Sequence, residues 1–357
     1  MTAAAVLDVS AVRDVVAALL HDRATPEVLD EAERTGWAPS VWTPLAEGGF
    51  AAVSVPEAAG GVGGSIAAAC AVLEEVGAAA APVPLAETGL LAGRLLAAAG
   101  LEVPGGALST VSSSSPPVLR RGVLSGRVRR VPWGRSVHRL VLLAGSDDGP
   151  VVVVVDPSRA AVTPGHDLAG EPRDTVDLDG VAPESVAPAP DGAGEALALR
   201  GALSRAALIA GATRRVLDLT VAYTGEREQF GRPVARFPAV AAHLVRIAEE
   251  TEMAGVAARS AAANAGPEGE PAFLEVAAAS SVASEAAGAV ATAAHQATGA
   301  MGMTREFALG RLTRRLWSWR DEWGGERRWS TRLGAALAAD GPDALWPTLA
   351  RGCDPDV

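Results

Sequence analysis

The sequence predicts an α+β fold, in which two helical zones flank a zone of short β-strands. Residues 12–99 and the chain from Glu195 onward carry apolar residues at three- and four-residue spacing, which is typical of amphipathic helices. Residues 107–187 instead contain short β-branched runs separated by Gly, Pro, Asp and Ser. The order of the zones predicts a helical, a small β- and a helical-bundle domain over residues 1–105, 106–190 and 191–357.

The amino-terminal zone contains two breaks between its helices. Trp37-Ala-Pro39 interrupts one helical stretch, and a glycine-rich turn follows at residues 60–64. Ser65 comes directly before the next apolar run, and its hydroxyl is suited to cap a helix. We therefore expect a helix that runs from this cap to Gly77.

The middle zone contains three β-branched runs, at residues 137–143, 151–155 and 175–178. Their shortness and the turn residues between them indicate a small antiparallel sheet or barrel. Residues 188–194 form a predicted linker to the second helical zone.

Four long helices are expected in the carboxy-terminal zone, followed by shorter ones to Leu349. Pro238 suits the first turn of the second helix, where a missing amide hydrogen costs little. The third helix is almost entirely Ala, Ser and Val, which permits close approach between helices. The expected bounds are Glu195–Thr224, Pro238–Ala265, Ala272–Thr298 and Thr304–Glu322.

The composition excludes several classes of function. Acidic residues outnumber basic residues by 42 to 31, and the net charge of −11 argues against nucleic acid or an anionic membrane as the main partner. Every basic residue in that count is arginine, which excludes lysine-dependent chemistry such as Schiff bases and P-loops. The five histidines have no metal-ligand spacing, so no metal site is expected.

The same composition indicates where the protein works. Although 49% of the residues are hydrophobic, much of this is alanine, and no run of about 18 to 20 strongly apolar residues predicts a membrane span. The amino terminus lacks the pattern of a secretory signal. Cys70 and Cys353 form no ligand-spaced or redox pair. We therefore expect a cytoplasmic protein.

The most informative segment is Tyr223–Phe237, which lies between two Ala-rich helical stretches. It places Arg227 at a helix end, directly before a Phe230-Gly231 turn. A planar, permanently charged guanidinium beside a sharp reversal suits an anionic ligand. The alternative is an arginine that only complements the helix dipole.

Several motifs together resemble the acyl-CoA dehydrogenase family along nearly the whole chain. In the first zone the resemblance lies in Leu45–Glu57, Gly60-Gly61-Val-Gly63 and Leu73–Gly77. In the third zone, Arg227-Glu-Gln-Phe-Gly231 and His295–Glu306 are similar to two carboxy-terminal signatures of the family. Two such signatures at this separation are a stronger indication than either alone.

The resemblance implies an FAD held between the β-domain and the helical bundle, with partner subunits completing its site. Arg227 matches the arginine that reaches the FAD pyrophosphate of a neighbouring subunit, and Phe230 belongs to the same motif. Gln296 and Gly299 match residues that contact the same cofactor, the glycine by allowing close backbone approach. A buried structural amide is the alternative for Gln296.

The reaction implied by the resemblance is α,β-dehydrogenation of an acyl-CoA thioester, a step of lipid metabolism. A desolvated carboxylate removes the α-proton, and the β-hydrogen leaves as a hydride to the flavin. The two positions that the family uses for this base fall on Gly201, which cannot act, and on Trp323. Glu322 directly precedes Trp323 and is the candidate base. The alternative is a solvated carboxylate paired with Arg320 or Arg327.

Further departures from the family pattern point in one direction. The middle zone lacks the Thr-Glu-Pro…Gly-Ser-Asp type of loop that normally bonds the flavin ring, and Pro238 replaces a glutamine that usually touches the cofactor. The residues with which a subunit contacts its own flavin are thus reduced in number. The residues that contact the flavin of a neighbouring subunit, Arg227 and Gln296, are retained. This asymmetry predicts the short subunit of an α₂β₂ tetramer whose longer homologous subunit supplies the base.

Two other hypotheses stay open. The chain is alternatively an active homo-oligomer with Glu322 as base, or a non-enzymatic relative that binds acyl-CoA or serves a structural role. In either enzymatic case, electron-transfer flavoprotein or a similar acceptor would reoxidise the flavin. The acyl group itself is not indicated, because the shape of the pocket between helices determines it.

Overall fold

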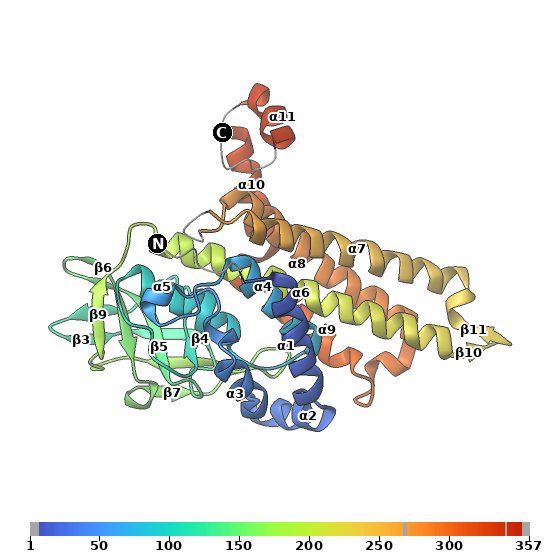
Figure 1. The fold of residues 1–357 in the computed structure, drawn as a ribbon, viewed down its shortest axis with the longest axis horizontal. Coiled ribbons are helices and arrows are strands. Elements are labelled where there is room, and N and C mark those ends of the chain that lie inside the picture. Colours follow the sequence, from blue (N-terminus) through green and yellow to red (C-terminus); the bar gives the residue numbers. More distant parts are fainter. Residues whose placement is uncertain (1–6, 267–269, 340, 352–357) are drawn as a thin grey trace. The chain divides into compact units, whose positions relative to one another are not determined.

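The computed structural model describes residues 7–266, 270–339 and 341–351. Within these ranges helices form both ends of the chain and β-strands form its middle, which confirms the predicted α+β fold (Figure 1).

The chain divides into two compact units. Unit 1 comprises Met1–Val72 and Ala81–Gly201, and unit 2 comprises Leu73–Ala80 and Ala202–Val357. The amino-terminal helices and the β-strands, which the sequence assigns to separate domains, therefore lie together in unit 1. One short segment, the carboxyl half of the helix Ile66–Ala79 with the residue after it, belongs to unit 2.

The amino-terminal helices begin at residues suited to capping. Thr25 Oγ1 accepts a hydrogen bond from the Val28 amide at 3.4 Å, and Gly36, with φ of 77°, follows the end of the same helix. Ser65 Oγ accepts from the Ala68 amide at 3.1 Å, which confirms the expected cap. The helices are α1 (Val9–Arg23), α2 (Pro26–Thr35), α3 (Pro39–Glu47), α4 (Ile66–Ala79) and α5 (Arg94–Ala98), with a buried π-helical segment (Ala86–Gly93) before α5.

A six-stranded sheet forms the larger part of the β-region. Its order is β3-β2-β5-β6-β9, and β1 also pairs with β5. The central pair runs antiparallel from Leu140 opposite Val155 to Ser146 opposite Gly149. The strands are β1 (Leu108–Ser109), β2 (Val118–Arg120), β3 (Val123–Ser125), β5 (Arg139–Ser146), β6 (Gly149–Val155) and β9 (Ser185–Pro188).

The prediction of an antiparallel sheet is wrong for two strands, because β1 and β2 both pair with β5 in parallel. Leu108 lies opposite Arg139 and Val118 opposite Gly145, so the two short strands follow β5 in the same direction, with residues 110–117 between them. Alternating apolar residues predict a strand but not the direction of its neighbour.

A second sheet, of three antiparallel strands, completes the β-region. Its order is β4-β8-β7, and its register shifts between Val128 and Val131, where Arg130 has φ of 57°. A shift of this kind is a β-bulge, which bends the strand locally. The strands are β4 (Arg127–Pro132), β7 (Ala161–Thr163) and β8 (Arg173–Asp177).

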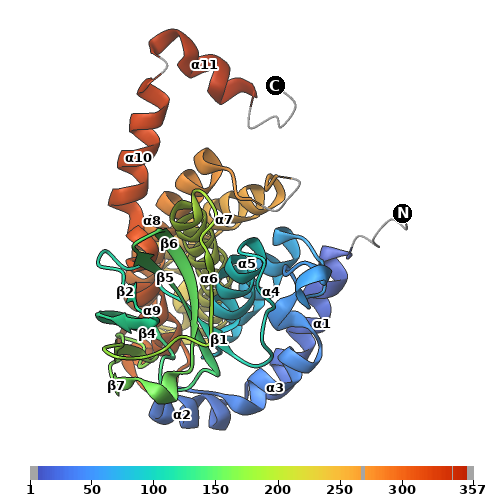
Figure 2. The same cartoon turned by 90° about the vertical axis from the view of Figure 1, so that its left-hand side faces the viewer.

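The carboxy-terminal helices form the predicted bundle. The helix α7 begins at Pro238 as expected, and α7 and α8 lie side by side along their length (Figure 1). In unit 2, α10 leads away from the α7–α8 pair, and α11 lies at its far end (Figure 2). The helices are α6 (Ala193–Glu226), α7 (Pro238–Ala263), α8 (Phe273–Thr298), α9 (Leu309–Trp319), α10 (Gly325–Ala339) and α11 (Pro342–Arg351).

The helix α9 is shorter than its predicted span of Thr304–Glu322. Gly299, with φ of 59°, ends α8 and begins a 3-10 turn, Gly299–Met303. At the other end, Trp323 has φ of 56°, a left-handed conformation that no α-helix continues through. Apolar spacing alone extends a helix past such backbone breaks.

The helix α8 and the turn after it, Phe273–Met303, are long and apolar enough to cross a membrane by length and composition, and this is the single such stretch among the described residues. Half of its most apolar window is buried, and α8 packs on α7 and α10. One helix of this kind is weak evidence for a membrane span, since core helices of soluble proteins have the same properties.

The helices α4 and α6 cross at unusually short range within unit 2. A Cβ added to Gly211 would overlap the carbonyl oxygen of Glu74, and one added to Gly77 would overlap that of Leu208. Beside the crossing, Arg214 Nη2 donates to both oxygens of Glu75 at 2.8 Å. Glycine on both helices thus sets the distance between them, and the ion pair fixes their rotation.

Candidate functional site

The Arg227 motif forms a tight hairpin at the end of α6. Its strands are β10 (Glu228–Gln229) and β11 (Arg232–Pro233), and the turn residues Phe230 and Gly231 have φ of 52° and 77°. Two successive positive φ values define a type I′ turn, which matches the twist of a hairpin. The expected sharp reversal is therefore present, and the hairpin extends from the end of α6 (Figure 1).

The side chains of this hairpin face solvent. Arg227 is exposed, and within the described ranges its guanidinium has no hydrogen bond or ion pair. Phe230 is 92% exposed at the tip. Arg232 lies over the ring of Phe237 at 4.2 Å, which braces the base of the hairpin. An unpaired cation and an exposed aromatic ring are thus presented together.

Gln296 and Gly299 lie at the carboxyl end of α8. The Gln296 side chain is exposed, so the alternative of a buried structural amide does not apply. A Cβ on Gly299 would have no atom within 4 Å, which leaves open space beside this backbone. Gly299 also takes a positive φ of 59°, a conformation that favours glycine.

His295 precedes Gln296 and is held in the interior of the bundle. Its Nε2 lies 2.9 Å from Thr313 Oγ1 on α9. Burial lowers the pKa of His295 below its usual range, because the charged imidazolium loses solvation there. The ring is therefore neutral near pH 7.

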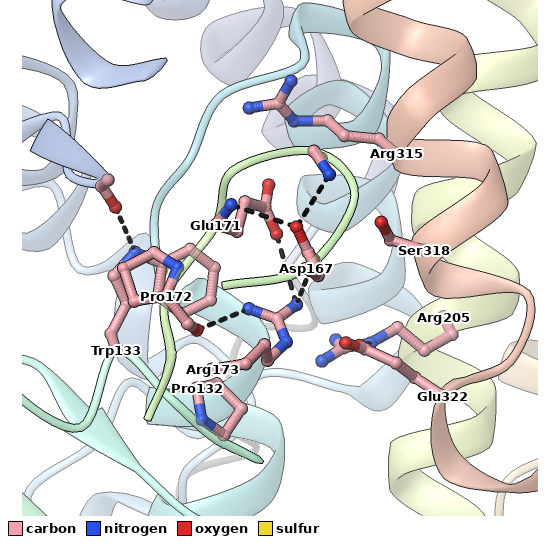
Figure 3. A network of polar contacts seen from close by, with 12 residues as sticks. Pro132, Trp133, Asp167, Glu171, Pro172, Arg173, Arg205, Arg315, Ser318 and Glu322 are labelled. Carbon is pink, nitrogen blue, oxygen red and sulfur yellow. Dashed lines mark hydrogen bonds and ion pairs between the residues drawn. The ribbon is translucent and has the colours of Figure 1, made fainter. Parts of the chain in front are cut away.

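Glu322 forms a buried ion pair that sequence reasoning missed. Arg205 Nε lies 2.6 Å from Glu322 Oε2, and the two side chains are 4% and 10% exposed (Figure 3). The expected alternative, a solvated carboxylate paired with Arg320 or Arg327, is wrong in both respects. Arg320 instead lies over the Trp317 ring at 4.6 Å and 3.6 Å from Asp321.

The position of Arg205 is the signal that could have identified this pair. Arg205 follows Gly201 by four residues on α6, so the two share one face of the helix. Arg205 therefore lies one helical turn from Gly201, a position that the family uses for a carboxylate. An arginine at this place is a candidate partner for a nearby acid such as Glu322. The guanidinium occupies an oxygen of Glu322 and stabilises its anionic form. The pair therefore makes Glu322 a weaker proton acceptor than a carboxylate without a cationic partner.

A second buried ionic cluster lies in unit 1. Arg173 Nη2 lies 3.3 Å from Asp167 and 3.2 Å from Glu171, and all three side chains are buried (Figure 3). The Arg173 guanidinium also lies 5.3 Å from the ring of Trp133. Trp133 is buried and donates from Nε1 to the Gly36 carbonyl at 2.9 Å. This cluster fixes Trp133 in the interior, and no sequence motif marks it.

An open groove of about 590 Å³ lies on unit 2 among α7, α8, α9 and α10. Gly288 leaves room for Arg320 in its wall, because a Cβ there would lie 2.6 Å from Arg320 Nη1. The charged and aromatic side chains that line the groove are those of His243, Arg246, Glu285, Trp317, Arg320 and Glu326. In the part of the chain that the structure describes, no three His, Cys, Asp or Glu side chains are grouped to hold a metal ion.

Family models match both helical parts of the chain. A model of the acyl-CoA dehydrogenase N-terminal domain matches residues 8–102, and one of the acyl-CoA dehydrogenase C-terminal domain matches residues 195–320. The second range contains Arg227, Gln296 and Gly299.

Two sequence relatives and one solved structure extend this likeness. Acyl-CoA dehydrogenase IpdE2 of Mycolicibacterium smegmatis is 31% identical over 317 residues, which cover 83% of this chain and 88% of that protein. Acyl-CoA dehydrogenase FadE34 of Mycobacterium tuberculosis is 31% identical over 329 residues, 87% of this chain but 44% of that protein. The ChsE4–ChsE5 complex of Mycobacterium tuberculosis has the same fold, with a TM-score of 0.81, 24% identity and coverage of 95% and 98% of the two chains.

Proposed function

Because the chain belongs to the acyl-CoA dehydrogenase family, we propose that it is the short subunit of an α₂β₂ acyl-CoA dehydrogenase. In this proposal it completes an FAD site that belongs mainly to a longer homologous subunit. The assembled enzyme would work in the cytoplasm and oxidise the Cα–Cβ bond of an acyl-CoA thioester. Electron-transfer flavoprotein or a similar acceptor would then take up the electrons.

The buried pair of Arg205 and Glu322 is the observation that carries the proposal. A base for the α-proton needs a carboxylate that is desolvated and yet free to accept a proton. Glu322 is desolvated, but its charge is already compensated by Arg205. Separating such a pair leaves buried charges and costs about 3–5 kcal/mol. The proposal therefore assigns the base to the partner subunit.

The exposed groups of this chain fit the diphosphate of FAD. Arg227 offers a permanent charge with a planar set of donors and has no competing partner in the described ranges. Gln296 offers an exposed amide, and the open backbone at Gly299 allows close approach. FAD, when bound, supplies the acceptor for the hydride; the residues of this chain bind and orient it.

Two of the relatives support a paired assembly. The solved structure with the same fold is a complex of two named proteins, ChsE4 and ChsE5. The match to FadE34 covers less than half of that protein, which leaves room for a second region of comparable size. A chain of this length is thus consistent with one half of a larger enzyme.

The visible absorption spectrum tests the proposal. The chain is purified alone and after co-expression with a longer homologue, and both preparations are assayed with acyl-CoA thioesters and a dye acceptor. We expect little flavin and no turnover from the chain alone, and both from the complex. Stoichiometric FAD and turnover from the lone chain would contradict the proposal. Acyl-CoA binding without flavin in either preparation would identify a non-enzymatic relative.

A second candidate function is an active homo-oligomer with Glu322 as base. The desolvation of Glu322, at 10% exposure in the turn after α9, favours it. Glu322→Gln should then abolish turnover by the lone chain while FAD stays bound. An unchanged rate would remove Glu322 from consideration.

A further inference from the structure

The His295 ring connects the end of α8 to α9 through one nitrogen. Thr313 Oγ1 lies 3.4 Å from the Gly310 carbonyl, to which it donates its single proton. With that proton directed to Gly310, the same oxygen accepts from His295 Nε2, 2.9 Å away, and Nδ1, which has no acceptor nearby within the described part of the chain, carries no proton. Hydrogen-bond logic thus assigns the proton to Nε2 and leaves Nδ1 as the unprotonated nitrogen.

The other edge of the ring faces the turn after α8. His295 Nδ1 is buried and has no hydrogen-bond partner among the described residues. A Cβ on Gly302 would lie 3.0 Å from this nitrogen and would overlap Thr298 Oγ1. Leu309 Cδ2 closes the third side, at 3.1 Å from the same position. The turn Gly299–Met303 is therefore packed against the ring, and glycine is the residue that fits at position 302.

His295 thus lies where α8, α9 and the turn Gly299–Met303 meet. Gln296 is the next residue along α8, and Gly299 begins the turn itself. The Gly299 amide donates back to the His295 carbonyl, which joins the two ends of this short segment. A displacement of the His295 ring would therefore also displace Gln296 and Gly299, through the backbone that connects the three residues.

We propose that His295 is a positioning residue, which fixes Gln296 and Gly299 by holding the end of α8 between Thr313 and Gly302. The inference that this arrangement serves FAD rests on the proposed function. The holding role itself depends on contacts within this chain alone. The neutral ring is required, because a proton on Nδ1 would be a buried donor without an acceptor.

Hydrogen exchange of the backbone amides of residues 299–304 tests the holding role in the full chain. His295→Ala removes the ring, and Thr313→Val removes its acceptor with little change of shape. Both should speed exchange in this segment by about tenfold, the worth of about one net hydrogen bond. His295→Gln should restore slow exchange, because its amide nitrogen donates from a position close to Nε2.

Thr292→Val is the matched control. Thr292 also lies on α8, but its hydroxyl donates to Gly288 within the same helix, at 2.8 Å. Exchange in residues 299–304 should be unchanged in this variant. Wild-type exchange rates in both His295→Ala and Thr313→Val would overturn the proposal. If His295→Ala does not fold, Thr313→Val decides the question.

Titration of FAD into the complex with the longer homologue tests what the contact serves. Thr313→Val should weaken FAD binding by about tenfold, and Thr292→Val should not change it. Faster exchange with unchanged FAD affinity would overturn the positioning role. Absence of FAD from the wild-type complex would instead refute the proposed function, and exchange would still decide whether His295 holds the segment.

Discussion

Arg205 Nε donates to Glu322 Oε2 at 2.6 Å, across 117 residues of sequence, and both side chains are almost fully buried. The pair joins α6 to the turn after α9 within unit 2. The proposed function makes this carboxylate a structural group, whereas the second candidate function makes it the base. Variants of these two residues therefore test both the stability of the chain and the choice between the two candidate functions.

Arg205→Leu should lower the free energy of unfolding by about 3–5 kcal/mol, because it removes the guanidinium that compensates the buried Glu322 carboxylate. The double variant Arg205→Leu/Glu322→Leu should be clearly more stable than Arg205→Leu, since neither charge of the pair remains. Urea denaturation of the wild type, the two single variants and the double variant measures the coupling. Additive losses would show that the two charges do not interact.

Gly211→Ala should destabilise the chain by about 1–3 kcal/mol, because the new methyl group overlaps the Glu74 carbonyl and forces α4 away from α6. Gly225→Ala, on the same helix, is the control: a Cβ there has no atom within 4 Å. Its effect should be neutral or slightly stabilising, given the higher helix propensity of alanine. Thermal unfolding measures both, and equal shifts would contradict the close crossing.

Arg227→Ala should weaken FAD binding by the complex about tenfold to a hundredfold, because it removes a charge-assisted contact to phosphate. Stability should not change, since the side chain is exposed and has no bonded partner among the described residues. Arg236→Ala removes an exposed arginine from the same connection and serves as the control for net charge. FAD titration followed by absorbance distinguishes the variants. Equal effects would indicate a nonspecific contribution of charge.

The stability of the chain should fall as the pH drops below about 6.5. Burial lowers the pKa of His295 in the folded chain, whereas the unfolded chain keeps the ordinary value of about 6.5. The unfolded chain therefore binds the proton more readily, and the contribution of the neutral ring is present above that pH and lost below it. His295→Gln should reduce this dependence. Melting temperatures of the wild type and of His295→Gln between about pH 8 and about pH 5 measure this dependence. The same dependence on pH in both proteins would contradict a role of His295 in it.

Local patterns in the sequence were sufficient for most of the fold. The Ser65 cap, the start of α7 at Pro238 and the turn at Phe230-Gly231 each depend on a few neighbouring residues, and the structure confirms them. The direction of β1 and β2 depends instead on pairing with β5, across about thirty residues of chain. Short-range periodicity carries no information on such pairing.

The candidate site divides in the same way. The exposed position of Arg227 follows from its place in a turn between two helices, a local feature. The partner of Glu322 is Arg205, which only the packing of the bundle brings close. His295 and Gly302 likewise appear in the sequence as parts of a motif, while their contact with each other depends on a turn that breaks the apolar pattern.

The crossing of α4 and α6 also bears on how the molecule is made. Unit 2 consists of residues 73–80 and of the chain from residue 202 onward. During synthesis the first of these two segments is therefore made long before the second. Glu75 leaves the ribosome 139 residues ahead of Arg214, and its place in unit 2 stays open until α6 is synthesised. Unit 2 is therefore the last to close, and a gene cut at codon 202 would yield a fragment in which Gly77 on α4 lacks the part of α6 that packs against it.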